Sequence, residues 1–184
     1  MSPYPRLLLR MCGAGLVLIL AASLLLSGEA PRTEMESIVK ATYLFKFLSF
    51  VEYPATKSTS QGGRSICVLG QDSFGSTLDA VARTQKVDGN PAQIRRIRAA
   101  AQAEECHILF LSAVDRRDVR GVISQLEARP VLTVSERPSF LDEGGMVLLF
   151  LDGGRLQFEI NGDAARRAGL RISAKLMQLS RSAR

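Results

Sequence analysis

Few residues in this sequence are of the types that catalyse reactions. The chain of 184 residues has one histidine, His107, which lies within an apolar stretch. A lone histidine in such a stretch is more often a buried core residue than a general base. The sequence also has no GxSxG elbow, no HExxH pair and no Cys/His cluster with zinc spacing. We therefore expect no catalytic residues, no metal and no cofactor. A hydrolase that uses His107 as its base is the least favoured hypothesis.

Two cysteines outside the N-terminal region form the best-defined chemical pair. An even pair in an exported chain is typical of one disulfide, here between Cys67 and Cys106. The chain-entropy model gives such a bond about 4 kcal/mol of stabilisation. The alternative is two buried thiols, because free cysteine packs like a small hydrophobe. An oxidising compartment favours the bond.

The N-terminal residues indicate that compartment. Arg6 and Arg10 precede an apolar run over residues 11–26, and Gly28 and Ala30 supply small residues before a possible cut. This is the pattern of a secretory signal peptide over residues 1–30. The apolar run is nearly as long as the roughly 20 residues that span a bilayer, so an uncleaved membrane anchor is the alternative. We expect an exported protein whose residues 31–184 form one domain.

The charge of the chain restricts its partners. The net charge of +6 favours an acidic partner, such as anionic lipid head groups, nucleotides or an acidic protein face. Solubility alone explains the charge equally well. Basic residues are not interleaved with aromatic ones as a strand-binding groove requires, which together with export argues against nucleic acid.

One strand-to-helix turn is the best candidate for a ligand site. Gly70, Gln71, Asp72 and Ser73 follow an expected strand and open an expected helix, with Asp72 or Ser73 as the N-cap. Ligands of parallel sheets bind at the carboxyl ends of strands. The turn lacks the Lys and Ser/Thr of a P-loop, so an ordinary tight turn is the alternative. A small-ligand-binding module that uses this rim is a second functional hypothesis.

An aromatic-rich helix is expected over residues 35–53. One stripe of this helix fits a core, and a second stripe carries Tyr43, Phe47 and Phe50. A helix that is apolar on two faces must bury both. We expect Tyr43, Phe47, Phe50 and Tyr53 to contact a partner or a second copy of the chain. Core packing is the alternative for each of them.

The rest of the chain alternates between short apolar strands and amphipathic helices. Strands are expected at residues 65–69, 92–98, 106–111, 131–134, 146–151 and 155–160, helices at 73–83 and 116–128, a loop at 55–64, a connection at 99–105 and a turn at 89–91. Asp152, Gly153 and Gly154 then form a hairpin turn, and Asn161 and Ser173 cap short helices. The pattern predicts a single-domain α/β fold: a mainly parallel sheet with helices on both faces and a C-terminal antiparallel hairpin.

Two segments resemble the YfiR-like family of exported proteins. KATYLF at residues 40–45 and FLSFVEYP at residues 47–54 resemble the opening helix of that family. GGR at residues 153–155, FEIN at residues 158–161 and GLRIS at residues 169–173 resemble its ending. The resemblance extends from about residue 37 to residue 179, which is nearly the whole chain after the leader.

This resemblance implies a function that the residues alone do not. It implies a periplasmic α/β domain that forms a homodimer, binds the sensor region of an inner-membrane diguanylate cyclase and holds that enzyme inactive. Family members pair cysteines at the positions of Cys67 and Cys106. Some have a second pair where Leu141 and Leu148 stand here, so that second bridge is missing. The first functional hypothesis is therefore a repressor of cyclic di-GMP signalling and biofilm formation that is not an enzyme.

Overall fold

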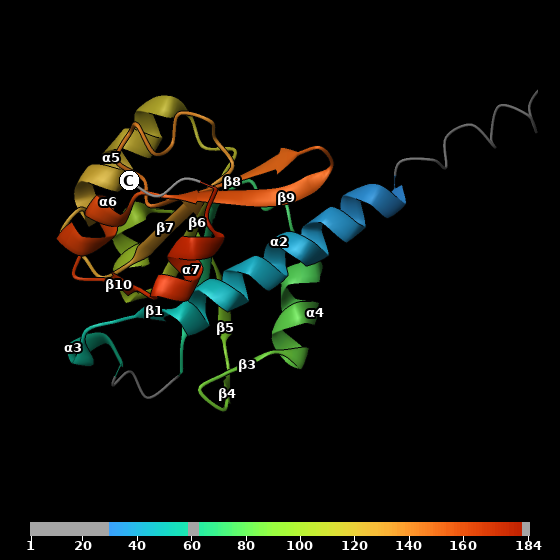
Figure 1. The fold of residues 1–184 in the computed structure, drawn as a ribbon, viewed down its shortest axis with the longest axis horizontal. Coiled ribbons are helices and arrows are strands. Elements are labelled where there is room, and N and C mark those ends of the chain that lie inside the picture. Colours follow the sequence, from blue (N-terminus) through green and yellow to red (C-terminus); the bar gives the residue numbers. More distant parts are fainter. Residues whose placement is uncertain (1–29, 59–62, 182–184) are drawn as a thin grey trace, which may run out of the picture. The chain divides into compact units, whose positions relative to one another are not determined.

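The computed structural model describes residues 30–58 and 63–181 of the chain (Figure 1). The chain divides into two compact units, Met1–Met35 and Glu36–Arg184. The predicted signal peptide over residues 1–30 lies outside the described residues except for Ala30, so its presence and cleavage stay predictions. No helix in the described part of the chain is long and apolar enough to cross a membrane. All the described strands belong to the second unit.

A six-stranded sheet forms the centre of the second unit, with the strand order β5-β2-β6-β7-β8-β9. Neighbours from β5 to β8 are parallel, and β9 pairs antiparallel with β8. The strands are β2 (Ser65–Gly70), β5 (Gln93–Ile97), β6 (Ile108–Ser112), β7 (Leu132–Ser135), β8 (Val147–Asp152) and β9 (Arg155–Ile160). The predicted α/β class, with a mainly parallel sheet and a C-terminal hairpin, is confirmed.

Burial explains why these segments form strands. All residues of β6 are buried, as expected for a parallel strand with helices on both sides. In β9, buried Phe158 and Ile160 alternate with more exposed neighbours, as in a strand covered on one face. Gly153 and Gly154 join β8 to β9 with φ angles of +55° and +76°. These left-handed values suit a two-residue hairpin turn, which glycine forms without strain.

Helices cover both faces of the sheet. On one face, the second-unit part of α2 (Ala30–Phe50) packs together with α4 (Thr77–Thr84), α6 (Gly162–Arg167) and α7 (Ala174–Leu179). This face carries most of the buried rings, so we call it the aromatic face. On the other face, η1 (Ala100–Glu105) and α5 (Arg116–Leu126) pack against the strands. We call this second face the disulfide face, because Cys67 and Cys106 belong to its cluster.

The helix after β2 begins later than its sequence predicts. The expected start was at residue 73, with Asp72 or Ser73 as the N-cap, but α4 begins at Thr77 with Ser76 as its N-cap. Oδ1 of Asp72 instead accepts a hydrogen bond from the N–H of Phe74 at 2.8 Å. Asp72 therefore closes a local turn before the helix starts, which is a common alternative use of a capping residue.

The first helix ends earlier than predicted, at Phe50 rather than at residue 53. Val51 and Glu52 form β1 (Val51–Glu52), which pairs antiparallel with β10 (Arg171–Ile172). The N–H of Ser173 also donates to the carbonyl of Phe50 at 3.0 Å. The C-terminal segment thus supplies hydrogen bonds that replace the next helical turn, and a local pattern cannot reveal such a distant partner.

Two connections contain more structure than the sequence predicts. The expected loop at residues 55–64 opens with a short helix, α3 (Ala55–Ser58), and residues 59–62 lie outside the described part. The turn expected at residues 89–91 is the second half of a small hairpin, in which β3 (Lys86–Val87) pairs with β4 (Asn90–Pro91). Its corner lies at residues 88–89, one position before the predicted turn.

Candidate functional site

The two cysteines are joined by a disulfide, as predicted. Cys67 lies in β2 and Cys106 lies two residues before the start of β6, the neighbouring strand, and their Cα atoms are 6.0 Å apart. That separation lies within the roughly 4.4–6.8 Å that a disulfide requires. The parallel pairing of β2 with β6 therefore creates the geometry for the bond.

The disulfide is inaccessible in the folded chain. Cys67 and Cys106 each expose 0% of their surface, and they pack with Ala103 of η1 and with Leu109 in the cluster of the disulfide face. A thiolate must reach a sulfur atom to exchange with a disulfide, so burial protects the bond from reductants. The position favours a structural bond, which a reducing agent reaches only when the surrounding structure opens.

Aromatic residues of α2 form the centre of the opposite face. The ring of Phe47 is fully buried and makes edge contacts with the rings of Tyr43 and Phe158, with centroid separations of 6.0 and 5.3 Å. Tyr43 also meets Phe158 edge-on at 5.7 Å. Such edge-to-face pairs stabilise by about 0.5–1.5 kcal/mol beyond the burial of their area. These rings fix α2 to the hairpin strand β9.

This packing corrects the predicted contact surface. Phe47 exposes 0% and Tyr53 exposes 9% of its surface, and both belong to the core cluster of the aromatic face. Their assignment to a partner contact is wrong, because the chain itself already covers them. Tyr43 and Phe50 are half-buried at the edge of the same cluster, and a role for these two in partner contact stays a prediction.

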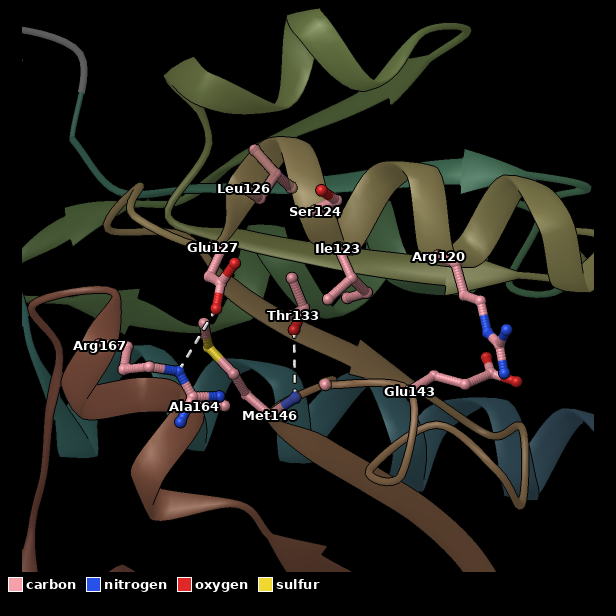
Figure 2. Close-up of a pocket in the computed structure, with 11 residues that line it drawn as sticks. Arg120, Ile123, Ser124, Leu126, Glu127, Thr133, Glu143, Met146, Ala164 and Arg167 are labelled. Atoms are coloured by element: carbon pink, nitrogen blue, oxygen red, sulfur yellow. Dashed lines mark hydrogen bonds and ion pairs between the residues drawn. The ribbon is translucent and has the colours of Figure 1, made fainter.

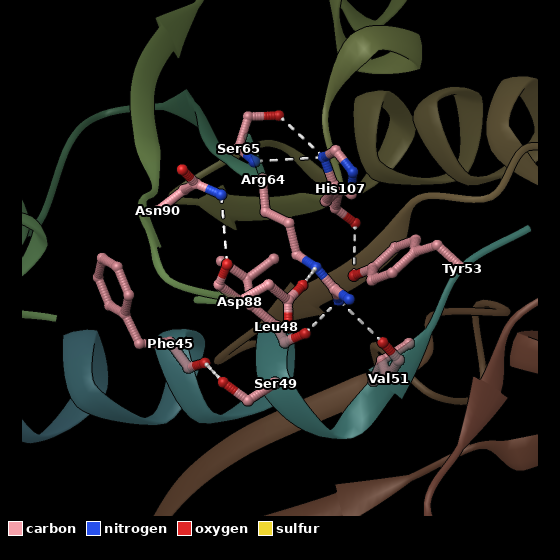
Figure 3. A network of polar contacts seen from close by, with 10 residues as sticks. All are labelled: Phe45, Leu48, Ser49, Val51, Tyr53, Arg64, Ser65, Asp88, Asn90 and His107. Carbon is pink, nitrogen blue, oxygen red and sulfur yellow. Dashed lines mark hydrogen bonds and ion pairs between the residues drawn. The ribbon is translucent and has the colours of Figure 1, made fainter. Parts of the chain in front are cut away.

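A buried polar network connects the end of α2 to the sheet (Figure 3). Arg64 donates to the backbone carbonyls of Leu48 and Val51, the latter at 3.0 Å, and pairs with Asp88 at 2.9 Å. The guanidinium carbon also lies 5.2 Å from the centre of the Tyr53 ring. Helix C-termini leave carbonyls without intrahelical partners. Arg64 therefore caps α2, a role that the sequence analysis missed because the helix and the arginine are separated by a loop.

His107 is a structural residue of this network. It exposes 3% of its surface, and its Nδ1 lies 3.2 Å from the N–H of Ser65, which donates to it. Tyr53 donates from its hydroxyl to the His107 carbonyl at 3.1 Å. Burial, helped by the positive charges of Lys57 and Arg64, lowers the pKa of His107 to about 4. The imidazole is thus neutral near pH 7, as an Nδ1 acceptor requires.

The predicted ligand rim is only partly free. Asp72 forms an ion pair with Arg96 at 2.9 Å, and the hydroxyl of Ser112 donates to Ser73 at 3.2 Å. Gly70 has a φ of +97°, and a Cβ there would lie 1.9 Å from the carbonyl oxygen of Ser112. Only glycine fits this close approach. Gln71 is exposed, and Gly70 lines a groove that extends away from the turn.

A different pocket lies between α5, α6 and the loop before β8 (Figure 2). Its volume is about 200 Å³, and most of its charged side chains have partners. Arg167 lies 3.6 Å from Glu127. Glu143 is buried, and its Oε1 accepts from Arg116 at 3.0 Å and from the hydroxyl of Ser139 at 2.9 Å. The volume is below the roughly 300–1,000 Å³ of typical small-molecule sites. We assign these contacts a role in holding the loop against α5.

The described residues form no cluster of metal-binding side chains. Residues 34–58 and 63–181 contain no group of three or more His, Cys, Asp or Glu side chains placed to hold an ion.

One solved structure shares this fold, and a second resembles it less closely. A conserved domain protein from Vibrio cholerae O1 biovar El Tor aligns with a TM-score of 0.54 and 14% identity, over 80% of this chain and 60% of that one. The chain thus spans less than two thirds of that protein. The ABC domain in complex with L-Trp from Streptococcus pneumonia aligns with a TM-score of 0.46 and 9% identity, over 66% of this chain and 55% of that one. That second likeness supports no statement about this chain, and the first concerns the fold alone.

The sequence itself matches a known family. Residues 37–181 match the YfiR/HmsC-like family, a segment that covers most of the chain and nearly all of the second unit. The match extends over the aromatic helix, the parallel sheet with its disulfide, and the C-terminal hairpin. It confirms the resemblance that was drawn from the two ends of the sequence. This chain belongs to the YfiR/HmsC-like family.

Proposed function

We propose that this protein is a periplasmic regulator that binds the sensor region of an inner-membrane diguanylate cyclase and represses the enzyme. Repression lowers cyclic di-GMP and, with it, biofilm formation. The observation that carries the proposal is the family match over residues 37–181, because the YfiR-like family comprises regulators of such cyclases. The protein acts by contact with its partner and turns over no substrate.

The cysteine chemistry is consistent with this compartment. A disulfide that is buried in the core forms and persists in an oxidising space such as the periplasm. The bond between Cys67 and Cys106 is of this kind. The leader pattern over residues 1–30 supports the same location.

Repression requires differential binding. A regulator shifts a cyclase towards its inactive state only if it binds the inactive sensor conformation more tightly than the active one. A shift from mostly active to mostly inactive enzyme takes a ratio of affinities of about 10⁴ for a complete switch. Partial repression needs proportionally less.

The edge of the aromatic face is the surface that we assign to partner contact. Phe50 is half-buried at the C-terminal end of α2, and the ammonium of Lys175 lies 5.7 Å from its ring centre. Tyr43 and the exposed side chain of Ile38 lie further along the same helix. Half-buried aromatic rings beside a cation are typical anchors of protein contacts. The same surface would hold the two copies of a homodimer.

Deletion in cells tests the function. We expect removal of the gene to raise cyclic di-GMP and biofilm mass, and re-expression of the full chain to restore both. The effect should disappear in a strain whose partner cyclase carries an inactivated catalytic domain. If cyclic di-GMP stays unchanged on deletion, the proposed function is wrong.

Binding of purified proteins tests the contact surface. We expect the periplasmic domain of the cyclase to bind the full chain, and Phe50→Ala to weaken that binding by about tenfold or more. Ser49→Ala is the matched control, because Ser49 is exposed and directly precedes Phe50 in the same helix. Equal binding by both variants would show that Phe50 does not contribute to the interface. Sedimentation of the same samples measures whether the chain alone is a dimer.

A further inference from the structure

The sheet has a topological switch point between β2 and β6. The chain leaves β2 through α4 on the aromatic face and returns to β5, on one side of β2. It leaves β6 through α5 on the disulfide face and returns to β7, on the opposite side. Because these two connections depart in opposite directions, a crevice forms at the carboxyl ends of β2 and β6. Open α/β sheets bind their ligands at such crevices.

A groove of about 640 Å³ lies at this crevice. Asp118 and Gly121 of α5 form part of one wall, and Arg98 with Ala100, which follow β5, form part of the other. Leu69 at the end of β2 contributes apolar surface between them. The volume falls within the roughly 300–1,000 Å³ of small-molecule sites.

The charged side chains of this groove are unpaired within the described chain. Asp115 and Asp118 both line the groove: Asp115 is the extended residue just before α5, Asp118 lies in its first turn, and both are exposed. Asp115 is the N-cap residue of α5, yet its side chain makes no capping hydrogen bond. Within residues 34–58 and 63–181, the carboxylates of Asp115 and Asp118 have no hydrogen-bond or ion-pair partner. The same is true of the guanidinium group of Arg98. Opposite charges therefore line one groove without neutralising each other.

Two other cavities differ in this respect. In the pocket between α5 and α6, Arg167 is paired with Glu127. In a cavity of about 380 Å³ beside His107, Arg95 is paired with Glu105 at 2.7 Å. Most charges of those two cavities are thus paired within the fold, and Arg120 in the first is the exception among the described residues. In the switch-point groove, Arg98, Asp115 and Asp118 are all available to a bound molecule.

We propose that the switch-point groove binds a small zwitterion. Its cationic amine lies against the carboxylates of Asp115 and Asp118, and its carboxylate accepts hydrogen bonds from Arg98. The guanidinium matches a carboxylate with two parallel N–H bonds. The apolar middle of the molecule covers Leu69 and Val122, which lie along the groove. Binding here would give the regulator an input that is separate from its protein contact.

Calorimetric titration of the purified full chain tests the ligand class. The probes are glycine, 4-aminobutyrate and 6-aminohexanoate, which vary the distance between the charges, with hexylamine and hexanoate as single-charge controls. We expect one of the zwitterions to bind at least about tenfold more tightly than either single-charge control. Equal affinities, or no binding by any zwitterion at millimolar concentration, would overturn the proposal.

Three variants test the location. Gly121→Gln places a side chain in the groove where a Cβ has no neighbour within 4 Å, so the fold has room for it. We expect this variant to lose zwitterion binding, and Asp118→Asn and Arg98→Gln to weaken it by about ten- to a hundredfold each. Arg117→Gln is the control, since Arg117 is exposed on α5 and does not line the groove.

The outcome is decisive in either direction. An unchanged melting temperature for Gly121→Gln shows that the loss of binding is not a loss of folding. If zwitterion binding survives in both Gly121→Gln and Asp118→Asn, the molecule binds elsewhere and the proposed site is wrong. This assay contains no cyclase, so its result is independent of whether repression occurs.

Discussion

The two faces of the central sheet are held together by different means. The aromatic face buries the larger cluster, in which rings of α2 and β9 meet edge-on and Phe74, in the turn before α4, meets Phe110 of β6 edge-on. The disulfide face buries a smaller cluster, covered by one α-helix and one short 3₁₀ helix. Within the described residues, Phe140 is its one fully buried ring. The covalent bond lies on the face with less apolar area.

This difference indicates how the fold divides its sources of stability. Burial of apolar area contributes about 25 cal/mol per Å², so the face with large rings is stable through packing alone. Short helices bury little area, and a 3₁₀ helix has weaker hydrogen-bond geometry. A disulfide compensates by restricting the unfolded chain. The free energy of unfolding should therefore depend on redox conditions, whereas the packing contributed by the aromatic face should not.

The largest expected effect comes from the aromatic face. Phe47→Ala removes a fully buried ring that contacts Tyr43 and Phe158, and we expect a loss of about 3–5 kcal/mol in the free energy of unfolding. Urea denaturation measures it. Leu151→Ala is the control, because that side chain is 52% exposed on the hairpin and should change stability little. Similar losses for both variants would mean that α2 does not pack as described.

The disulfide gives the next largest effect. We expect Cys67→Ala with Cys106→Ala to lose about 2–4 kcal/mol, because the bond joins residues 39 positions apart. Reductant added to the unfolded wild type should produce the same stability as the double variant. The Phe47→Ala loss should be equal with and without the bond, since the two sites lie on opposite faces.

Accessibility sharpens the same prediction. Both cysteines are fully buried, so a mild thiol reductant should leave the native bond intact and should reduce it faster as urea is added. Mass spectrometry after alkylation measures the fraction reduced. Rapid reduction without denaturant would contradict a purely structural bond and would favour redox control of the protein.

A smaller effect is expected from the polar network beneath α2. Tyr53→Phe removes a buried donor to the carbonyl of His107, which still accepts from the N–H of Leu132 at 2.8 Å. We therefore expect the modest loss of one hydrogen bond, about 0.5–1.5 kcal/mol. Tyr43→Phe is the matched control, since its hydroxyl is half-buried and lies 3.4 Å from the carbonyl of Leu156. If both variants lose the same free energy of unfolding, the buried hydrogen bond of Tyr53 contributes no more than the half-buried one of Tyr43.

Protonation of His107 should change the free energy of unfolding only in acid and not at neutral pH. Burial, with Lys57 and Arg64 nearby, lowers the pKa of His107 to about 4, whereas the unfolded value is about 6.5. Between these values the unfolded chain binds a proton that the folded chain does not. Stability from this group is therefore complete above pH 6.5 and declines as the pH falls towards 4.

His107→Asn tests this assignment, because its side-chain oxygen can still accept from the N–H of Ser65. We expect the variant to lose less stability than the wild type between pH 7 and pH 5, measured as the shift of the urea midpoint. Equal shifts in both proteins would show that other groups cause the acid sensitivity.

Most of the sheet was predictable because its strands are continuous apolar segments bounded by turn residues. Residues 106–111 predicted the central strand β6, and the Asp152-Gly153-Gly154 turn predicted the hairpin. Helix ends were less predictable. Asp72 has the chemistry of an N-cap but forms a turn instead, because Arg96 and Phe74 compete for its carboxylate. Such competition depends on residues that are distant in the sequence.

The candidate sites were predictable in chemistry more than in position. The cysteine pair was identified because its members can do little else in an exported chain. Phe47 and Tyr53 were assigned to a partner because a helix pattern does not show which stripe a sheet will cover. The switch-point groove includes Gly70 of the predicted rim. Its charged residues come from elsewhere: Arg98 lies between β5 and η1, and Asp118 lies in the first turn of α5. No local motif unites Arg98 with Asp118.

The sequence by itself determined the α/β class, the hairpin, the disulfide and the family. These follow from short-range patterns, in which period, turn residues and cysteine count are read directly from neighbouring positions. Only the tertiary structure decided which aromatic rings are core, which arginine caps α2, and where unpaired charges face one another. Those outcomes depend on strand order, because the order β5-β2-β6-β7 places α4 on one face of the sheet and η1 and α5 on the other, and so brings distant residues together.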